Sequence, residues 1–219
     1  MVTPESAAGR RLRADAAATQ ALLLRTAERL FAERGVHAVS NRRIAVAAGQ
    51  GSNSAVGYHI GTKADLVAAI MRAHAAPMDR LRAEMLDRAQ ASAQLRDHIA
   101  CLVLPLTRHL ADLGVPSWYA RFAAQVSFDP ALRTVAIHEA TSTPVMRRAM
   151  DMMLAQAPPG PPGAWTALRP GMARHLIIHT CADREQALAD GNAPSGETWA
   201  QTGQMLIDAI AALMTAAPR

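Results

Sequence analysis

The sequence predicts an all-α protein, and three observations support that prediction. Aromatic residues make up only 4% of the chain, while alanine, leucine and methionine are abundant, a composition that favours helices over sheets. Apolar residues recur at helical spacing along most of the chain, and no segment alternates apolar and polar residues as a half-buried strand does. A chain of 219 residues that is 50% hydrophobic can bury a core in one domain or two.

The first third of the chain holds the most informative pattern of helices. A one-sided helix is expected over residues 19–34, because its apolar residues follow i, i+4, i+7, i+8 spacing. Gly35 would end this helix, and Ser40 would cap a short second one. A third short helix would follow a glycine-containing turn, and a fourth would begin after Thr62. Two short helices joined by a turn are the arrangement that places one helix in the DNA major groove.

Prolines divide the remainder of the chain. Pro77 interrupts the helical pattern and predicts a border between an N-terminal domain, residues 19–76, and a larger domain, residues 77–219. Residues 1–18 are expected to form a disordered basic leader, and the PPGPP segment at 158–162 a loop. Further helices are predicted over residues 78–93, 94–113, 117–127, 130–157 with a kink or break near Pro144, 167–189 and 196–216.

The positive charge is concentrated in the same first third. Residues 1–75 contain ten Arg and Lys against five Asp and Glu, whereas residues 76–219 contain thirteen of each. Such an excess indicates a polyanion such as the DNA phosphate backbone. A solvated leader would give the same excess, because Arg10, Arg11 and Arg13 lie in it, so charge alone does not decide between the two.

Several classes of protein and site are not expected. No run of about 18 apolar residues predicts a membrane span, and the N-terminus lacks the apolar core of a signal peptide. Cys101 and Cys181 show no metal-ligand spacing, so we expect two reduced thiols in a cytoplasmic protein. His175 and His179 are four residues apart, but no third ligand supports a metal site, and no cofactor is predicted.

Two adjacent stretches carry a resemblance to a known family. LFAERGVHAVSNRRIAVAAG at 30–49 is followed by SAVGYHIGTKADLVAAI at 54–70. A helix ending in FAERG, the IAxxAG element, the YH pair and the GTK cap occur in order, so residues 19–72 resemble the N-terminal domain of the TetR family of bacterial transcriptional regulators. The resemblance implies a three-helix helix-turn-helix domain followed by a larger helical domain for effector binding and dimerisation. Beyond Pro77 only the helical layout and length agree.

The resemblance also implies which residues meet DNA. Ser40 and Thr62 would cap helices whose amide ends face phosphates, and Lys63, the only lysine in the chain, would add a charge there. Arg42 would reach a base, and the contact that arginine makes best is a bidentate one to guanine. The implied DNA-binding set is Ser40, Asn41, Arg42, Arg43, Ser52, Asn53, Ser54, Ala55, Gly57, Tyr58, His59, Thr62 and Lys63.

Two features depart from the common family pattern. The turn is one residue longer, with Gln50 as the extra residue, and Gly57 stands where relatives often have an aromatic residue. A glycine there loosens the short helix by about 1 kcal/mol relative to alanine. Short helix-turn-helix segments are also ordinary packing units in all-α proteins, so the ordered family elements carry the prediction rather than the spacing.

The second domain is expected to dimerise and to hold a pocket. Apolar stripes on the last two helices predict a four-helix dimer interface, although such stripes also pack within one subunit; the candidates are Leu168, Met172, Leu176, Trp199, Met205, Leu206 and Ile210. Methionine and aromatic side chains at helical spacing are pocket candidates, although plain core is the commoner role of such stripes; the set is His109, Trp118, Phe122, Met146, Met150 and His175.

These inferences together predict a homodimeric transcriptional regulator. The simplest form is a repressor that an unknown small-molecule effector releases from a palindromic operator in double-stranded DNA. The alternative is a helical small-molecule-binding or interaction protein whose helix-turn-helix is degenerate. An enzyme is not expected, because the chain shows no GxSxG, HExxH, GxxxxGK[ST] or GxGxxG motif.

Overall fold

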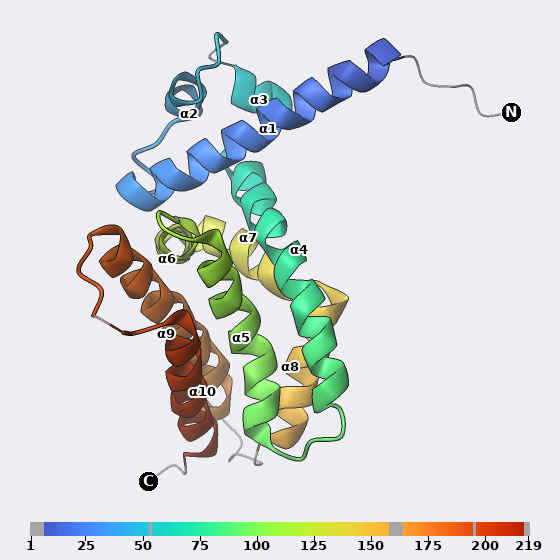
Figure 1. The fold of residues 1–219 in the computed structure, drawn as a ribbon, viewed down its shortest axis with the longest axis vertical. Helices are drawn as coiled ribbons and strands as arrows, with labels where there is room; N and C mark the ends of the chain where they lie inside the picture. Colours follow the sequence, from blue (N-terminus) through green and yellow to red (C-terminus); the bar gives the residue numbers. More distant parts are fainter. Residues whose placement is uncertain (1–6, 53, 158–163, 195, 217–219) are drawn as a thin grey trace, which may run out of the picture.

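The computed structural model describes residues 7–52, 54–157, 164–194 and 196–216, and within these ranges the chain is helical without a strand (Figure 1), which confirms the all-α prediction. In Figure 1, α1 lies across one end of a bundle formed by the later helices, and α2 and α3 lie on its outer side. The helices are α1 (Ala7–Arg34), α2 (Asn41–Ala47), α3 (Ala55–His59), α4 (Lys63–Ala89), α5 (Leu95–Leu113), α6 (Tyr119–Phe128), α7 (Pro130–Thr141), α8 (Pro144–Gln156), α9 (Ala164–Ala189) and α10 (Trp199–Thr215).

The predicted interruption of the helical pattern at Pro77 is wrong. Helix α4 runs through Pro77 without interruption, from the helix-turn-helix region into the bundle. A proline inside a helix costs about 3 kcal/mol, because it has no N–H to donate and its ring crowds the preceding turn. The packing of α4 against α5, α7 and α8 outweighs that cost, and residues such as Leu66 and Leu86 are fully buried along it.

The predicted disordered leader is also wrong for the part that the structure describes. Helix α1 begins at Ala7, so residues 7–18 are helical, and residues 1–6 lie outside the described ranges. The run of alanines at 16–18 explains the extension, since alanine has the highest helix propensity. The expected break near Pro144 is confirmed, because α7 ends at Thr141 and Thr143 caps α8 by accepting a hydrogen bond from the amide of Met146 at 3.2 Å. The PPGPP segment lies outside the described residues.

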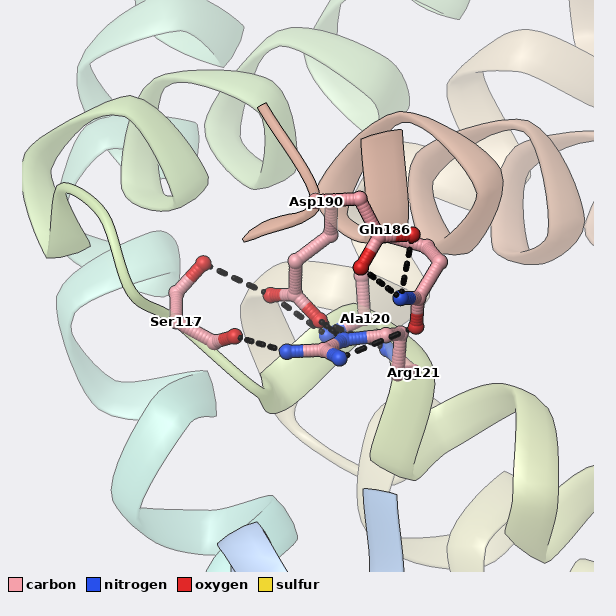
Figure 2. Close-up of polar contacts among 6 residues, drawn as sticks. Ser117, Ala120, Arg121, Gln186 and Asp190 are labelled. Atoms are coloured by element: carbon pink, nitrogen blue, oxygen red, sulfur yellow. Dashed lines mark hydrogen bonds and ion pairs between the residues drawn. The ribbon is translucent and has the colours of Figure 1, made fainter. Parts of the chain in front are cut away.

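A buried carboxylate from α9 holds the start of α6. Glu185 is 1% exposed, and its Oε1 accepts hydrogen bonds from the Ser117 hydroxyl at 2.8 Å and the Ala120 amide at 3.3 Å. Its Oε2 accepts from the Arg121 amide at 2.9 Å and from Arg121 Nε at 3.3 Å. Figure 2 shows Ser117, Ala120 and Arg121 gathered at this point, with Gln186 beside the guanidinium. Glu185 thus satisfies the free amides of the α6 N-terminus from a different helix.

The opposite side of α6 carries α1 and the loop after it. Phe122 stacks on Phe31 of α1 with ring centroids 6.1 Å apart, and both side chains are fully buried. His37, in the loop that follows α1, lies 3.1 Å from the Asp129 carboxylate at the end of α6. One continuous apolar core therefore runs from the helix-turn-helix region into the bundle through the contact between α1 and α6.

Replacing Glu185 with alanine should lower the free energy of unfolding by about 3 kcal/mol, because it removes the carboxylate that pairs with the partly buried Arg121 and leaves two helix amides without their acceptor. Urea denaturation followed by circular dichroism measures this change. The matched control is Glu84→Ala, which removes an ion pair with Arg88 whose glutamate is 66% exposed and should cost less than about 0.5 kcal/mol. Equal effects of the two substitutions would contradict the role assigned to Glu185.

Candidate functional site

Helices α2 and α3 form the two arms of the helix-turn-helix. Ser40 caps α2, since its hydroxyl accepts a hydrogen bond from the Arg43 amide at 3.2 Å. The inward sides of the two helices bury Ile44 and Val56 completely. Gly49 takes a positive φ of 67° in the turn between them, where glycine is favoured, and the amide of the extra residue Gln50 bonds the Ala45 carbonyl at 2.9 Å. Gln50 therefore continues the backbone hydrogen bonding of α2 into the turn.

The outward side of α2 and α3 exposes arginine, small and aromatic side chains. Arg42 and Arg43 are exposed on α2, and Tyr58 on α3 is 86% exposed, with its ring edge-on to His59 at 4.9 Å. Ser52, Ser54 and Gly57 are exposed between and along the helices, and Asn53 lies outside the described residues. Ala55 is the exception among the predicted residues, because it is 6% exposed and packs inward, so the prediction that it faces DNA is wrong.

The start of α4 is engaged within the protein. Thr62 and Asp65 form a capping box, in which the Asp65 carboxylate accepts from the Thr62 amide at 2.9 Å and the Thr62 hydroxyl accepts from the Asp65 amide at 3.2 Å. The Thr62 hydroxyl also donates to the Asp65 carboxylate at 2.7 Å, and this bond together with the one from the Thr62 amide lowers the pKa of Asp65, so a carboxylate already occupies this helix end. The Lys63 ammonium donates to the Val36 carbonyl at 2.8 Å and ties α4 to the loop after α1. Thr62 therefore caps α4 as predicted, whereas the sequence did not indicate the contact of Lys63 with Val36.

The comparison with known families bears on the same residues. Residues 23–70 match the sequence model of a family described as bacterial regulatory proteins, tetR family. The match runs from the middle of α1 into α4 and includes both arms of the helix-turn-helix.

Residues 23–70 are a TetR-family DNA-binding domain. The matched segment is less than a quarter of the chain. No curated protein matches the chain. Among the described residues, no helix has the length and apolar character needed to cross a membrane.

A cavity of about 310 Å³ lies in the bundle among α4, α5, α6, α7, α8, α9 and α10. Met146 and Met150 line it, together with Met153 from the next turn of α8. The other four predicted pocket residues do not line it. Phe122 is core, Trp118 precedes α6 and packs on the core, and His109 pairs with another histidine. His175 lies exposed on α9, one residue after Arg174, which does line the cavity.

The cavity contains few polar groups. Arg82, 2% exposed, pairs with the Asp79 carboxylate and donates through Nε to the Cys101 carbonyl at 3.2 Å. Burial lowers the pKa of Arg82 from its ordinary value, and the Asp79 charge opposes that shift. Tyr119 lines the cavity with its hydroxyl 3.9 Å from the Met71 sulfur, and burial raises its pKa. The sequence offered no signal for this set, because its members come from three different helices.

A chain of polar contacts connects this cavity to α1. Tyr119 stacks on His74 of α4 with centroids 3.9 Å apart. His74 Nε2 lies 3.0 Å from the Glu28 carboxylate of α1, and its Nδ1 lies 2.7 Å from Nε2 of His109 on α5. Burial first, and then the neighbouring His74, lower the pKa of His109 to about 4. Glu28, His74 and His109 therefore join the DNA-binding domain to the bundle.

The last two helices each expose apolar side chains. Leu168 is 56%, Met172 44% and Met205 67% exposed, and a groove between α9 and α10 includes Leu176, Met205 and Ala209. Trp199 is partly buried under the Arg184 guanidinium, whose carbon lies 5.2 Å from the ring centroid. Leu206 and Ile210 are 2% exposed because their side of α10 packs on α5, so their prediction as interface residues is wrong and they belong to the subunit core.

Replacing Gly57 with alanine should stabilise the protein by about 0.4–1 kcal/mol, since Gly57 lies inside α3 and a Cβ there meets no atom within 4 Å. Thermal unfolding measures the change. The matched comparison is Gly61→Ala, which should destabilise, because Gly61 has φ of 116° and a Cβ would lie 2.6 Å from an Asp65 carboxylate oxygen. A stabilising Gly61→Ala would contradict the geometry of this helix start.

Acid should weaken the contact between α1 and the bundle through His109. Its pKa is 6.5 when unfolded and about 4 when folded, so on lowering the pH the unfolded chain takes up a proton before the folded chain does. The free energy of unfolding should then fall between about pH 6.5 and 4 by up to about 1.4 kcal/mol per pH unit. Urea denaturation of the wild type and His109→Gln at pH 7 and 5 measures this. The difference in free energy of unfolding between the wild type and His109→Gln should be smaller at pH 5 than at pH 7. An equal pH dependence of the two proteins would contradict the lowered pKa of His109.

Proposed function

We propose that the protein is a homodimeric repressor whose small-molecule effector binds in the bundle cavity and releases the protein from a palindromic operator. The observation that carries this proposal is that α4 belongs to both sites. Its first turns, including Leu66 and Ile70, complete the core of the helix-turn-helix, and its later turns line the cavity through Met71, Met78 and Arg82. A ligand that moves the middle of α4 therefore acts on the helices that face DNA.

For DNA contact we propose the exposed side of α2 and α3. We assign Arg42 to a guanine and Arg43 and Tyr58 to phosphates; the exposure of these side chains supports the assignment. Ser52, Ser54 and Gly57 leave room for close approach of the duplex. Because Asp65 occupies the start of α4, the amide end of α2 at Ser40 is the better phosphate site of the two helix starts.

For dimerisation we propose the exposed sides of α9 and α10. Leu168, Met172 and Met205 are exposed apolar residues on these helices, and the groove between them would receive side chains of a second copy. Two helices from each subunit would form a four-helix interface. The two helix-turn-helix units would then be separated by about 34 Å, one turn of DNA, as a palindromic operator requires.

For coupling we propose that Tyr119 and His74 transmit the presence of a ligand. Tyr119 lines the cavity and stacks on His74, and His74 bonds Glu28 of α1. A ligand that displaces Tyr119 would change this stack and thereby the position of α1. Ligand and DNA must then weaken each other's binding by the same factor, because both act on one equilibrium.

The proposal is tested by DNA binding measured as fluorescence anisotropy, with duplexes from the chain's own upstream region and an unrelated duplex. Arg42→Ala should weaken specific binding about 5- to 150-fold, the loss of one bidentate base contact. Arg43→Ala should weaken binding to both duplexes and reduce the dependence on salt between about 50 and 200 mM. Arg147→Ala, an exposed arginine on α8, is the control and should change nothing.

The same titrations give the stoichiometry, which should be two chains per operator. Absence of binding at low salt would overturn the proposal and would favour a helical ligand-binding protein with a degenerate helix-turn-helix. Equal affinity for the specific and the unrelated duplex would overturn the assignment of Arg42 as a base-reading residue.

A further inference from the structure

The cavity in the bundle is an apolar chamber whose walls can adapt to a flexible ligand. Methionines from α4 and α8 and isoleucines from α5, α7, α9 and α10 supply most of the lining. Unbranched methionine side chains reshape around varied apolar surfaces. Since a water takes up about 30 Å³ in the liquid, a volume of about 310 Å³ admits an apolar body of at least about ten carbon-sized groups.

Arginines without acidic partners line the same cavity. Arg133 comes from α7 and Arg174 from α9, and neither guanidinium has a hydrogen bond or ion pair with any residue that the structure describes. Arg133 is exposed and Arg174 is partly buried, and after desolvation the charges of both act on one imidazole by lowering the pKa of His175, Arg174 more strongly than Arg133. An anion that enters this opening is attracted by both positive charges.

The nearby carboxylates, Asp79 and Glu139, are already paired with other arginines and do not neutralise Arg133 or Arg174. Asp79 lines the cavity, but it is paired with Arg82. Glu139, on the same helix as Arg133, is paired with Arg72 of α4. The lining therefore carries an excess of positive charge, located at Arg133 and Arg174.

We infer that the ligand of this cavity is an anionic amphiphile: a carboxylic acid with a flexible apolar tail. The tail lies among the methionines, and the carboxylate accepts hydrogen bonds from Arg133 and Arg174, which bind carboxylates in a two-pronged geometry. This inference rests on the proposed function in taking the cavity as the effector site, and it adds the chemical class of the effector.

The test compares ligands that share a tail and differ in charge. Isothermal titration calorimetry on the full chain without DNA would use dodecanoate, 1-dodecanol and dodecyltrimethylammonium below their micelle concentrations. Dodecanoate should bind at least tenfold more tightly than the alcohol, and the cation more weakly than either. Octanoate should bind more weakly than dodecanoate, because it buries fewer methylene groups.

Variants of this chain locate the two halves of the ligand. Arg133→Gln with Arg174→Gln should bring the affinities for dodecanoate and dodecanol to within about twofold, whereas Arg147→Gln, on the exposed side of α8, should leave the tenfold preference. Ala136→Phe places a ring in the cavity and should abolish binding of both. Circular dichroism melts verify that each variant is folded, and Arg174→Lys offers a second, conservative variant that should keep part of the preference.

The outcomes separate this inference from the proposed function. Equal binding of dodecanoate and dodecanol, no binding of either, or a preference that survives loss of both arginines would overturn the inference, even if the protein binds its operator. Arginine-dependent binding of dodecanoate by a protein that does not bind DNA would support the inference and overturn the proposed function.

Discussion

The position of α6 is the constraint on which the arrangement of the two regions depends, and Glu185 sets that position. A carboxylate that is 1% exposed is tolerated only when its charge is compensated, and here two backbone amides, a hydroxyl and the Arg121 guanidinium surround it. These donors place the first turn of α6 against α9. Because Phe122 of that helix stacks on Phe31, the same interaction fixes where α1 lies on the bundle.

Helix α4 makes the second connection, and it does so with a proline inside it. A break at Pro77 would have separated the helix-turn-helix from the cavity. Continuity through Pro77 instead keeps Leu66, in the core of the DNA-binding domain, on the same rigid element as Met78, in the cavity wall. The DNA-binding domain is therefore held at two points, by α6 under α1 and by α4 itself, with the contact between His74 and Glu28 between them.

The sequence was most informative where structure depends on neighbouring residues. Ser40 as a cap, the turn at Gly49 and the break before Pro144 are decided by local backbone chemistry, and all were predictable. Glu185 capping α6 and Lys63 binding the Val36 carbonyl join residues far apart in the chain, so no local pattern indicated them. Leu206 and Ile210 could not be assigned from the sequence for a similar reason. An apolar stripe predicts that a helix face is buried, but it does not indicate whether the helix that covers it belongs to the same subunit.

The capping box at the start of α4 has a consequence for DNA recognition. The Asp65 carboxylate accepts from the Thr62 amide, so this helix end presents a negative group where a phosphate would otherwise lie, and the Lys63 charge is directed to the loop after α1. Within α2 and α3, the exposed arginine side chains are Arg42 and Arg43 on α2, next to the Ser40 cap. Gly57 gives α3 no side chain next to the exposed Tyr58. We therefore expect α2 to make most of the contacts that position the duplex. The short α3 would then follow the groove that α2 defines.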